Sequence, residues 1–85
     1  MEMDNNNLPK ISNELTGKRI KELRKKSGYS VNDLKEILGL GTKQAIYNWQ
    51  NGESIPSIDN LVILATVFEV KIDDIIVKQP KKMGT

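Results

Sequence analysis

The chain has 85 residues, with 13 Lys and Arg against 11 Asp and Glu, which predicts one small domain of net charge +2. It has no cysteine and no histidine, which excludes disulfides, zinc centres built on those side chains and a histidine acid–base catalyst. The charge is uneven: residues 17–52 hold eight basic residues against three acidic ones, and residues 53–77 hold five acidic residues against Lys71 alone. The basic half suggests a face that binds a polyanion. Most runs of charged residues, however, simply lie on the solvent-exposed surface of a helix.

The two ends of the chain are expected to be flexible tails. Residues 1–12 are polar and acidic, with three consecutive asparagines, and residues 78–85 are polar and basic. The first residues lack the basic start and apolar run of a signal peptide, and the longest apolar stretch, residues 61–70, is too short to cross a bilayer. We therefore expect a folded domain over residues 13–77 in a cytoplasmic protein without membrane contacts.

A first helix is predicted to begin at an N-cap Thr16 and to continue to about Ser27. Ile20 and Leu23 lie three residues apart and would share its buried face, while Lys and Arg occupy most of the other positions. Gly28 follows the helix and can adopt the left-handed conformation in which helices often end.

A second helix is predicted after Ser30, because Asp33 three residues later forms a capping box with it. Three apolar residues would make its apolar stripe: Leu34, Ile37 and Leu38. The segment Gly39–Gly41 then predicts a sharp turn, since two of its three residues are glycine.

A third helix is predicted from an N-cap Thr42 to the Asn51–Gly52 pair. Its inward side chains are expected to be Ala45, Ile46 and Trp49. Trp49 could in principle stack on a ligand, but its helical spacing from Ile46 favours a place in the core.

A fourth helix is predicted after Pro56, with Ser57 as its N-cap. Its apolar side chains cover a wide face and predict the most buried helix: Ile58, Leu61, Val62, Leu64, Ala65 and Phe68. A short fifth helix is expected near Asp73 and Asp74, where the helix dipole favours negative charge. Its apolar residues would either complete the core or form a dimer seam: Ile72, Ile75, Ile76 and Val77. Five short helices with short connections predict a compact all-α bundle.

Three segments carry a resemblance to a known family: IKELRKKSGYSVNDLKEILGL, TKQAIYNWQNG and IPSIDNLVILATVFEVKIDDII. The spacing of Ile46, Trp49, the Asn51–Gly52 pair and the Pro56–Ser57 pair is specific as a set. From about residue 17 to residue 77 the chain resembles the lambda-repressor-like (Cro/repressor-type, Xre) helix-turn-helix domains. The resemblance implies a compact five-helix bundle with the helix-turn-helix at helices 2 and 3. It also implies that the third helix lies in the major groove and that homodimers span palindromic operators.

The chain departs from this family at three places. Val31 stands where members often have a glutamine that contacts a phosphate, and Gly41 makes the turn one residue longer than usual. Members often pair an arginine of the first helix with a glutamate of the third. Here the resemblance places Arg24 opposite Gln50, so a charge-to-amide hydrogen bond is expected in place of the ion pair.

The outer positions of the third helix carry side chains that can read bases. Gln44 and Asn48 can each make two hydrogen bonds to adenine, and Lys43 can reach guanine acceptors or a phosphate. Tyr47 offers its ring to a thymine methyl group and its hydroxyl to a phosphate. The resemblance implies base contacts at positions 43, 44 and 48. The alternative is a solvated polar face without a partner.

Phosphate contacts are expected from helix N-termini and short polar side chains. The candidates are Arg19, Ser30, Thr42, Asn51 and Ser54. The role of Asn51 is implied by the resemblance. Lys18 and Lys35 could add long-range attraction, although each could equally well be only solvated.

The predicted function is a sequence-specific DNA-binding transcriptional regulator, a repressor, associated with the nucleoid when it is bound to double-stranded DNA. No cofactor, metal or catalysis is expected, because Asp73 and Asp74 point in different directions on a helix and no phosphate-binding loop or activated nucleophile is present. The alternative is an antitoxin-like or antagonist-regulated protein-interaction module with the same fold, whose tails would dock a regulatory protein partner.

Overall fold

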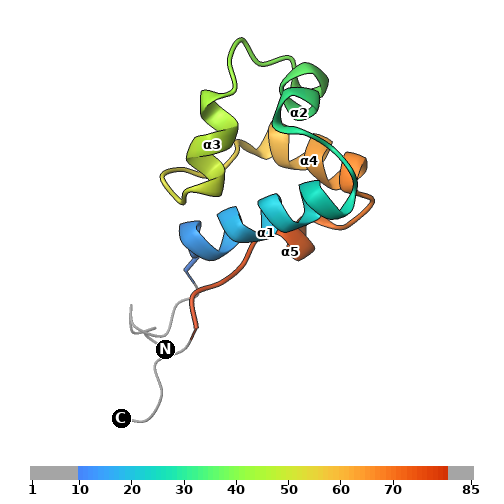
Figure 1. Ribbon diagram of the computed structural model, residues 1–85. Coiled ribbons are helices and arrows are strands. Elements are labelled where there is room, and N and C mark those ends of the chain that lie inside the picture. Colours follow the sequence, from blue (N-terminus) through green and yellow to red (C-terminus); the bar gives the residue numbers. More distant parts are fainter. Residues whose placement is uncertain (1–9, 81–85) are drawn as a thin grey trace, which may run out of the picture.

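The protein is a bundle of five helices, seen in a computed structural model that describes residues 10–80 (Figure 1). The helices are α1 (Asn13–Lys26), α2 (Val31–Leu38), α3 (Gln44–Gln50), α4 (Ile58–Phe68) and α5 (Ile72–Ile75). The predicted all-α class and number of helices are confirmed. None of these helices combines the length and the apolar character that crossing a membrane requires.

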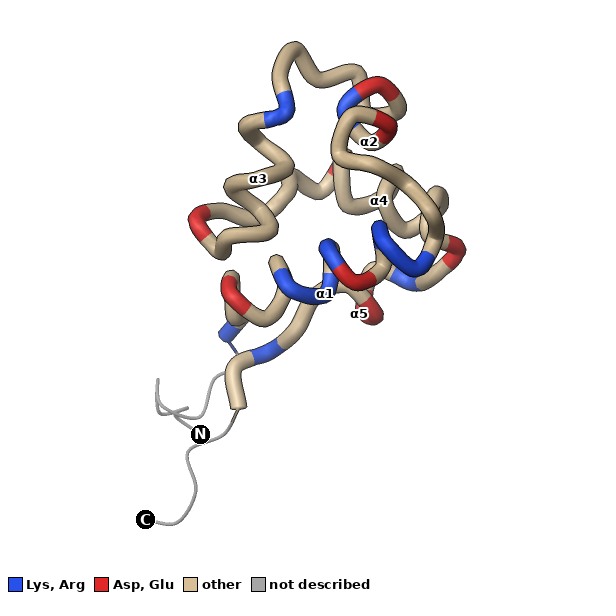
Figure 2. Tube along the Cα trace, viewed as in Figure 1, with Lys and Arg blue, Asp and Glu red and all other residues tan. Residues whose placement is uncertain are grey.

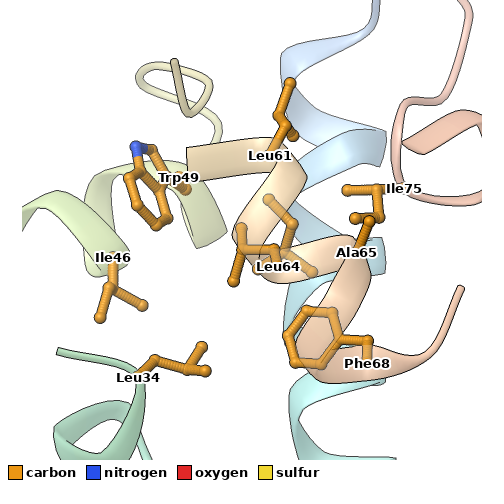
Figure 3. Close-up of a cluster of buried hydrophobic side chains, with 9 residues drawn as sticks. Leu34, Ile46, Trp49, Leu61, Leu64, Ala65, Phe68 and Ile75 are labelled. Carbon is orange, nitrogen blue, oxygen red and sulfur yellow. The ribbon is translucent and has the colours of Figure 1, made fainter. Parts of the chain in front are cut away.

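All five helices contribute to one apolar core. α1 provides Ile20, α2 provides Leu34 and α5 provides Ile75, each fully buried. The remaining core residues come from α3 and α4: Ile46, Trp49, Leu61, Leu64, Ala65 and Phe68. Figure 3 shows the α4 side chains in the middle of this cluster. Because most helices supply only one or two core residues, the core is completed only when all five come together.

The start of α1 differs from the prediction. The N-cap is Ser12, whose side chain accepts a hydrogen bond of 3.1 Å from the Leu15 N–H, so the prediction that Thr16 caps this helix was wrong. Thr16 lies one turn inside the helix and is fully buried. Its hydroxyl accepts a hydrogen bond of 2.9 Å from the Val77 N–H. The Val77 N–H, which is only partly exposed, thus has a partner, and Thr16 joins α1 to the segment after α5.

The segments that flank the bundle run side by side. The Ser12 N–H donates to the Val77 carbonyl at 2.8 Å, and the Gln79 N–H donates to the Lys10 carbonyl at 2.7 Å. Ile11 and Lys78 form an isolated antiparallel bridge between them. The expected domain boundaries, at residues 12–13 and 77–78, thus fall within this paired region. The rest of the two expected tails, residues 1–9 and 81–85, lies outside the described residues.

α4 buries a narrower face than expected. Leu61, Leu64, Ala65 and Phe68 face the core, but Ile58 is 71% exposed and Val62 is 48% exposed. Val62 follows Leu61 directly and therefore points about 100° away from it, and Ile58 lies in the first turn, beyond the edge of the core. The prediction that these two residues belong to the buried face of this helix was wrong.

α5 completes the core through Ile75, and Ile72 and Ile76 are partly buried against the same cluster. The Lys71 N–H donates to the Asp74 carboxylate at 3.1 Å, which caps the start of the helix. The apolar residues of this helix were expected either to complete the core or to form a dimer seam, and Ile75 completes the core.

Gly17 lies where α1 approaches the carboxyl end of α3. A Cβ at this position would run into the carbonyl oxygen of Trp49 and lie 2.9 Å from that of Gln50. Both obstacles are backbone atoms of α3, so a side chain here can be accommodated only if the two helices move apart.

We expect Gly17→Ala to lower the free energy of unfolding by about 1–3 kcal/mol, the usual effect of forcing extra volume into a packed interior. Urea denaturation would measure this loss as a lower transition midpoint. Gly41→Ala is the matched control, because nothing lies within 4 Å of its added Cβ. Equal midpoints for the two variants would contradict the close packing of α1 on α3.

Candidate nucleic-acid interface

α2 and α3 are joined by a short turn that begins at Gly39, a glycine in the left-handed conformation. Gly39 ends α2 with a φ of 68°, in the left-handed region that favours glycine. The next residue, Leu40, donates its N–H to the Lys35 carbonyl at 3.0 Å and packs against the core. The predicted glycine turn is thus confirmed, with Leu40 anchoring it to the bundle.

α3 begins one residue later than predicted. Its N-cap position is Lys43, which makes no side-chain capping bond. The Thr42 hydroxyl still accepts a hydrogen bond of 3.3 Å from the Gln44 N–H, so it satisfies one amide at the start of the helix. The prediction that Thr42 itself is the N-cap was therefore wrong in position, although its side chain serves the same end.

The outward face of α3 carries the predicted base-reading side chains. Ile46 and Trp49 are buried, which turns the opposite side of the helix outward. Lys43, Gln44 and Tyr47 are exposed, and Asn48 is half-buried beside them. All four candidates thus lie along α3 or at its start, with polar groups available to a partner.

Two of these candidates are hydrogen-bonded to each other. The Gln44 Nε2 atom donates to the Asn48 Oδ1 atom at 2.9 Å. The prediction treated the two amides as independent readers of adenine. Their spacing of four residues on one helix was the available signal, since side chains so spaced are neighbours.

The far end of α3 is attached to α1 through Arg24. Its Nε atom donates to the Gln50 Oε1 atom at 3.0 Å, and its Nη1 atom donates to the Tyr29 carbonyl at 2.8 Å. The charge-to-amide bond expected from the family resemblance is confirmed. Arg24 therefore connects α1, the α1–α2 connection and the last residue of α3.

The phosphate-contact candidates occupy three separate places. Ser30 is the N-cap of α2, whereas Asn51 and Ser54 are exposed at the end of α3 and in the loop that follows it. Thr42 is exposed before α3, and Arg19 is exposed on α1. Four of the five thus lie at the ends of α2 and α3 or in the loops beside them, and Arg19 belongs to a different helix.

The basic residues are concentrated on α1. Six of the eight in residues 17–52 belong to this helix: Lys18, Arg19, Lys21, Arg24, Lys25 and Lys26. In Figure 2 blue bands recur along α1 in the lower half of the bundle, whereas the α2–α3 connection lies at the top. Lys43 is the only Lys or Arg between Glu36 and Lys71. The outward face of α3 therefore depends on amide and phenol groups and this single lysine.

The predicted capping box at the start of α2 is present. The Ser30 side chain accepts from the Asp33 N–H at 3.0 Å, and the Asp33 carboxylate accepts from the Ser30 N–H at 2.9 Å. The Ser30 backbone hydrogen bond and, to a lesser extent, its side chain hold the pKa of Asp33 below its ordinary value of 3.8.

We expect the capping box to make stability depend on pH. Because the folded state lowers the Asp33 pKa, the contribution is complete above 3.8 and is lost as pH falls through the lowered pKa. Asp33→Ala should therefore reduce the melting temperature at pH 7, and its difference from the unaltered protein should shrink in acid.

Asp33→Asn is the control for this titration, because it keeps an acceptor oxygen but cannot ionise. The difference between the Asn and Ala variants should stay constant over the same pH range. A difference between the unaltered protein and Asp33→Ala that does not change with pH would show that ionised Asp33 adds nothing to the cap. Thermal melts followed by circular dichroism would measure all three proteins.

The fold and the exposed face of α3 define a class of protein, the helix-turn-helix proteins, in which a second short helix is presented to DNA. A family model described as Helix-turn-helix matches residues 20–75. In solved structures, the chain is similar to the restriction-modification controller protein C.AhdI from Aeromonas hydrophila. The match has a TM-score of 0.65 and 25% identity, and it covers 74% of this chain and 94% of that one.

Two archaeal relatives are named as HTH-type transcriptional regulatory proteins. The relative from Thermococcus kodakarensis is 36% identical over 72 residues, which covers 76% of this chain and 22% of the relative. The relative from Pyrococcus furiosus is 38% identical over 55 residues, which covers 65% of this chain and 17% of the relative. The chain thus spans about a fifth of the length of these relatives. It belongs to the helix-turn-helix family, in its lambda-repressor-like (Xre) form.

Proposed function

We propose that this protein is a sequence-specific transcriptional repressor that inserts α3 into the major groove of a palindromic operator, with no chemistry of its own. The orientation of α3 carries the proposal. Ile46 and Trp49 face the core, while Gln44 and Tyr47 face outward on the same seven-residue helix. Because its target would be genomic DNA, we place its action on the nucleoid in the cytoplasm.

The proposed contacts divide into base readout and phosphate positioning. Lys43, Gln44, Tyr47 and Asn48 would contact base edges. Phosphate contacts would come from Ser30, Thr42, Asn51 and Ser54 at the ends of α2 and α3, and from Arg19 on α1. If the Lys and Arg side chains of a dimer neutralise about six phosphates, the logarithm of the binding constant should fall with the logarithm of salt concentration at a slope of roughly −5, to which the neutral contacts add nothing.

Selection of preferred sites from a random DNA pool tests the proposal. The protein should enrich a site with two symmetric halves, because a two-fold dimer reads a palindrome. Gln44→Ala should weaken binding to that site by about 1–3 kcal/mol through loss of a base contact, and should leave affinity for random DNA unchanged. Fluorescence anisotropy at fixed salt would measure both affinities.

Gln79→Ala is the matched control, an exposed glutamine outside α3, and it should bind both DNAs as the unaltered protein does. If Gln44→Ala keeps the same ratio of specific to random affinity, α3 does not read bases through this residue and the proposal fails.

We also propose that the protein acts as a homodimer. A lone domain of this size makes few specific contacts, and two α3 helices about 34 Å apart could read two half-sites one DNA turn apart. Ile58 and Val62, exposed one turn apart on α4, provide an apolar strip for a self-complementary contact. They suit this role better than Ile75, which is already buried in its own core.

We expect Val62→Glu to shift the protein from dimer to monomer, because two copies would bring a charge into an apolar seam. Val62 is already 48% exposed, so the fold itself should tolerate the change. Analytical ultracentrifugation would measure the mass, and circular dichroism would check the helices. Ile37→Glu is the control, since Ile37 is 43% exposed but belongs to α2 and not to the helix of the proposed seam. A dimer that persists in Val62→Glu would place the seam elsewhere.

The alternative of a protein-interaction module depends on the two tails. Most of these tails, residues 1–9 and 81–85, lies outside the described residues. Within residues 10–80, the exposed face of α3 favours DNA as the partner.

A further inference from the structure

The hydrogen bond between Gln44 and Asn48 lies on a part of the molecule that is well held. α3 is fixed on its inner side by Ile46 and Trp49 and at its end by the Arg24–Gln50 bond. Asn48 is half-buried, whereas Gln44 is exposed. An exposed amide is therefore hydrogen-bonded, at 2.9 Å, to a half-buried one.

This bond limits what the Gln44 amide can offer to DNA. A glutamine amide has two N–H donors and one acceptor oxygen. One Nε2 hydrogen is directed to Asn48, which leaves one donor and the oxygen. Adenine presents one acceptor, N7, and one donor, N6, in the major groove. The remaining groups of Gln44 match this pair. Guanine presents two acceptors, N7 and O6, so the Gln44 oxygen would face an acceptor there.

The same bond leaves Asn48 with a different set of groups. The bond from Gln44 occupies one of the two lone pairs of its Oδ1 atom, so the two hydrogens of Nδ2 are the groups that it offers to a partner without competition. A side chain that offers donors suits an edge made of acceptors, and guanine, with N7 and O6, is the base that presents two. Asn48 is thereby less suited to adenine than Gln44, although both carry the same amide.

We infer that Asn48 is a positioning residue that orients Gln44 to read adenine, and that it also donates directly to a guanine at a neighbouring base pair. The inference rests on the proposed function and adds to it the bases that the two amides distinguish. It assigns unequal roles to two side chains of identical chemistry, because one gives a hydrogen to the other.

Site selection with variants of Asn48 tests this division of roles. The base pair read by Gln44 is first identified as the one whose preference relaxes in Gln44→Ala, and we expect adenine there. Asn48→Ala removes the acceptor that holds Gln44, so the preference for adenine should fall about tenfold and the preference for guanine at the second position should disappear.

Asn48→Asp separates the two roles, because it keeps an oxygen to accept from Gln44 and loses the donors toward DNA. Its overall affinity should be lower because a negative charge is added, so base preferences are compared and not affinities. It should keep the adenine preference at the Gln44 position and lose the guanine preference. Asn51→Ala, which removes an exposed amide just beyond α3, should weaken binding without changing either preference.

The possible outcomes are distinguishable. If the unaltered protein enriches no site, both the proposed function and this inference fail. If it enriches a site but Asn48→Ala keeps the full preference for adenine, the function stands and the positioning role is overturned. Guanine at the Gln44 position with adenine at the Asn48 position would also overturn the inference, because it requires the amide bond to run in the opposite direction.

Discussion

The packing of α1 against α3 at Gly17 is the contact on which the candidate interface depends. α3 has seven residues, which is too short for a helix to be stable by itself in water. Its position must come from its neighbours, and α1 provides the nearest one, because the absence of a side chain at Gly17 lets the carbonyl oxygens of Trp49 and Gln50 approach. A looser contact would leave the outward residues of α3 without a defined orientation.

Arg24 adds a directional restraint to this packing. The apolar contacts of Ile46 and Trp49 attach α3 to the core, but the hydrophobic effect has no preferred direction. The Arg24–Gln50 hydrogen bond, at 3.0 Å, depends on angle and therefore requires a particular rotation of the helix. The same arginine holds the Tyr29 carbonyl just before α2. One side chain of α1 thus constrains both sides of the helix-turn-helix, and the rotation it sets is the one that leaves Gln44 exposed.

Features that depend on neighbours in the sequence were predictable. The Ser30–Asp33 capping box and the inward side of α3 follow from spacing alone. The left-handed Gly28, with a φ of 84°, follows from a glycine directly after a helix. The start of α1 was not predictable in this way, because Ser12 and Thr16 are both good capping residues one turn apart. What separates them is the Val77 N–H, 61 residues away, which takes up the Thr16 hydroxyl.

Contacts between distant residues needed other information. The Arg24–Gln50 bond joins residues 26 positions apart, and the family resemblance indicated it where the local pattern could not. The exposure of Ile58 and Val62 was missed, because an apolar side chain favours burial but does not show which residues it packs against. For Gln44 and Asn48, spacing indicates that they are neighbours, but only their geometry assigns the donor and the acceptor.

The charges around α3 bear on how selectivity and attraction would be divided under the proposed function. Asp33 lies beside Ser30, and Glu53 lies between Asn51 and Ser54, so acidic groups accompany the proposed phosphate contacts on both sides. The basic residues of α1 contribute a longer-range field, which salt screens over about 8 Å at physiological ionic strength. With most of the basic residues on α1 and acidic residues beside the proposed phosphate contacts of α2 and α3, random DNA would gain little from α3 itself. Under the proposed function, the affinity for a particular site would then come largely from the amide hydrogen bonds of α3. The orientation of a single glutamine would in that case decide which base is read.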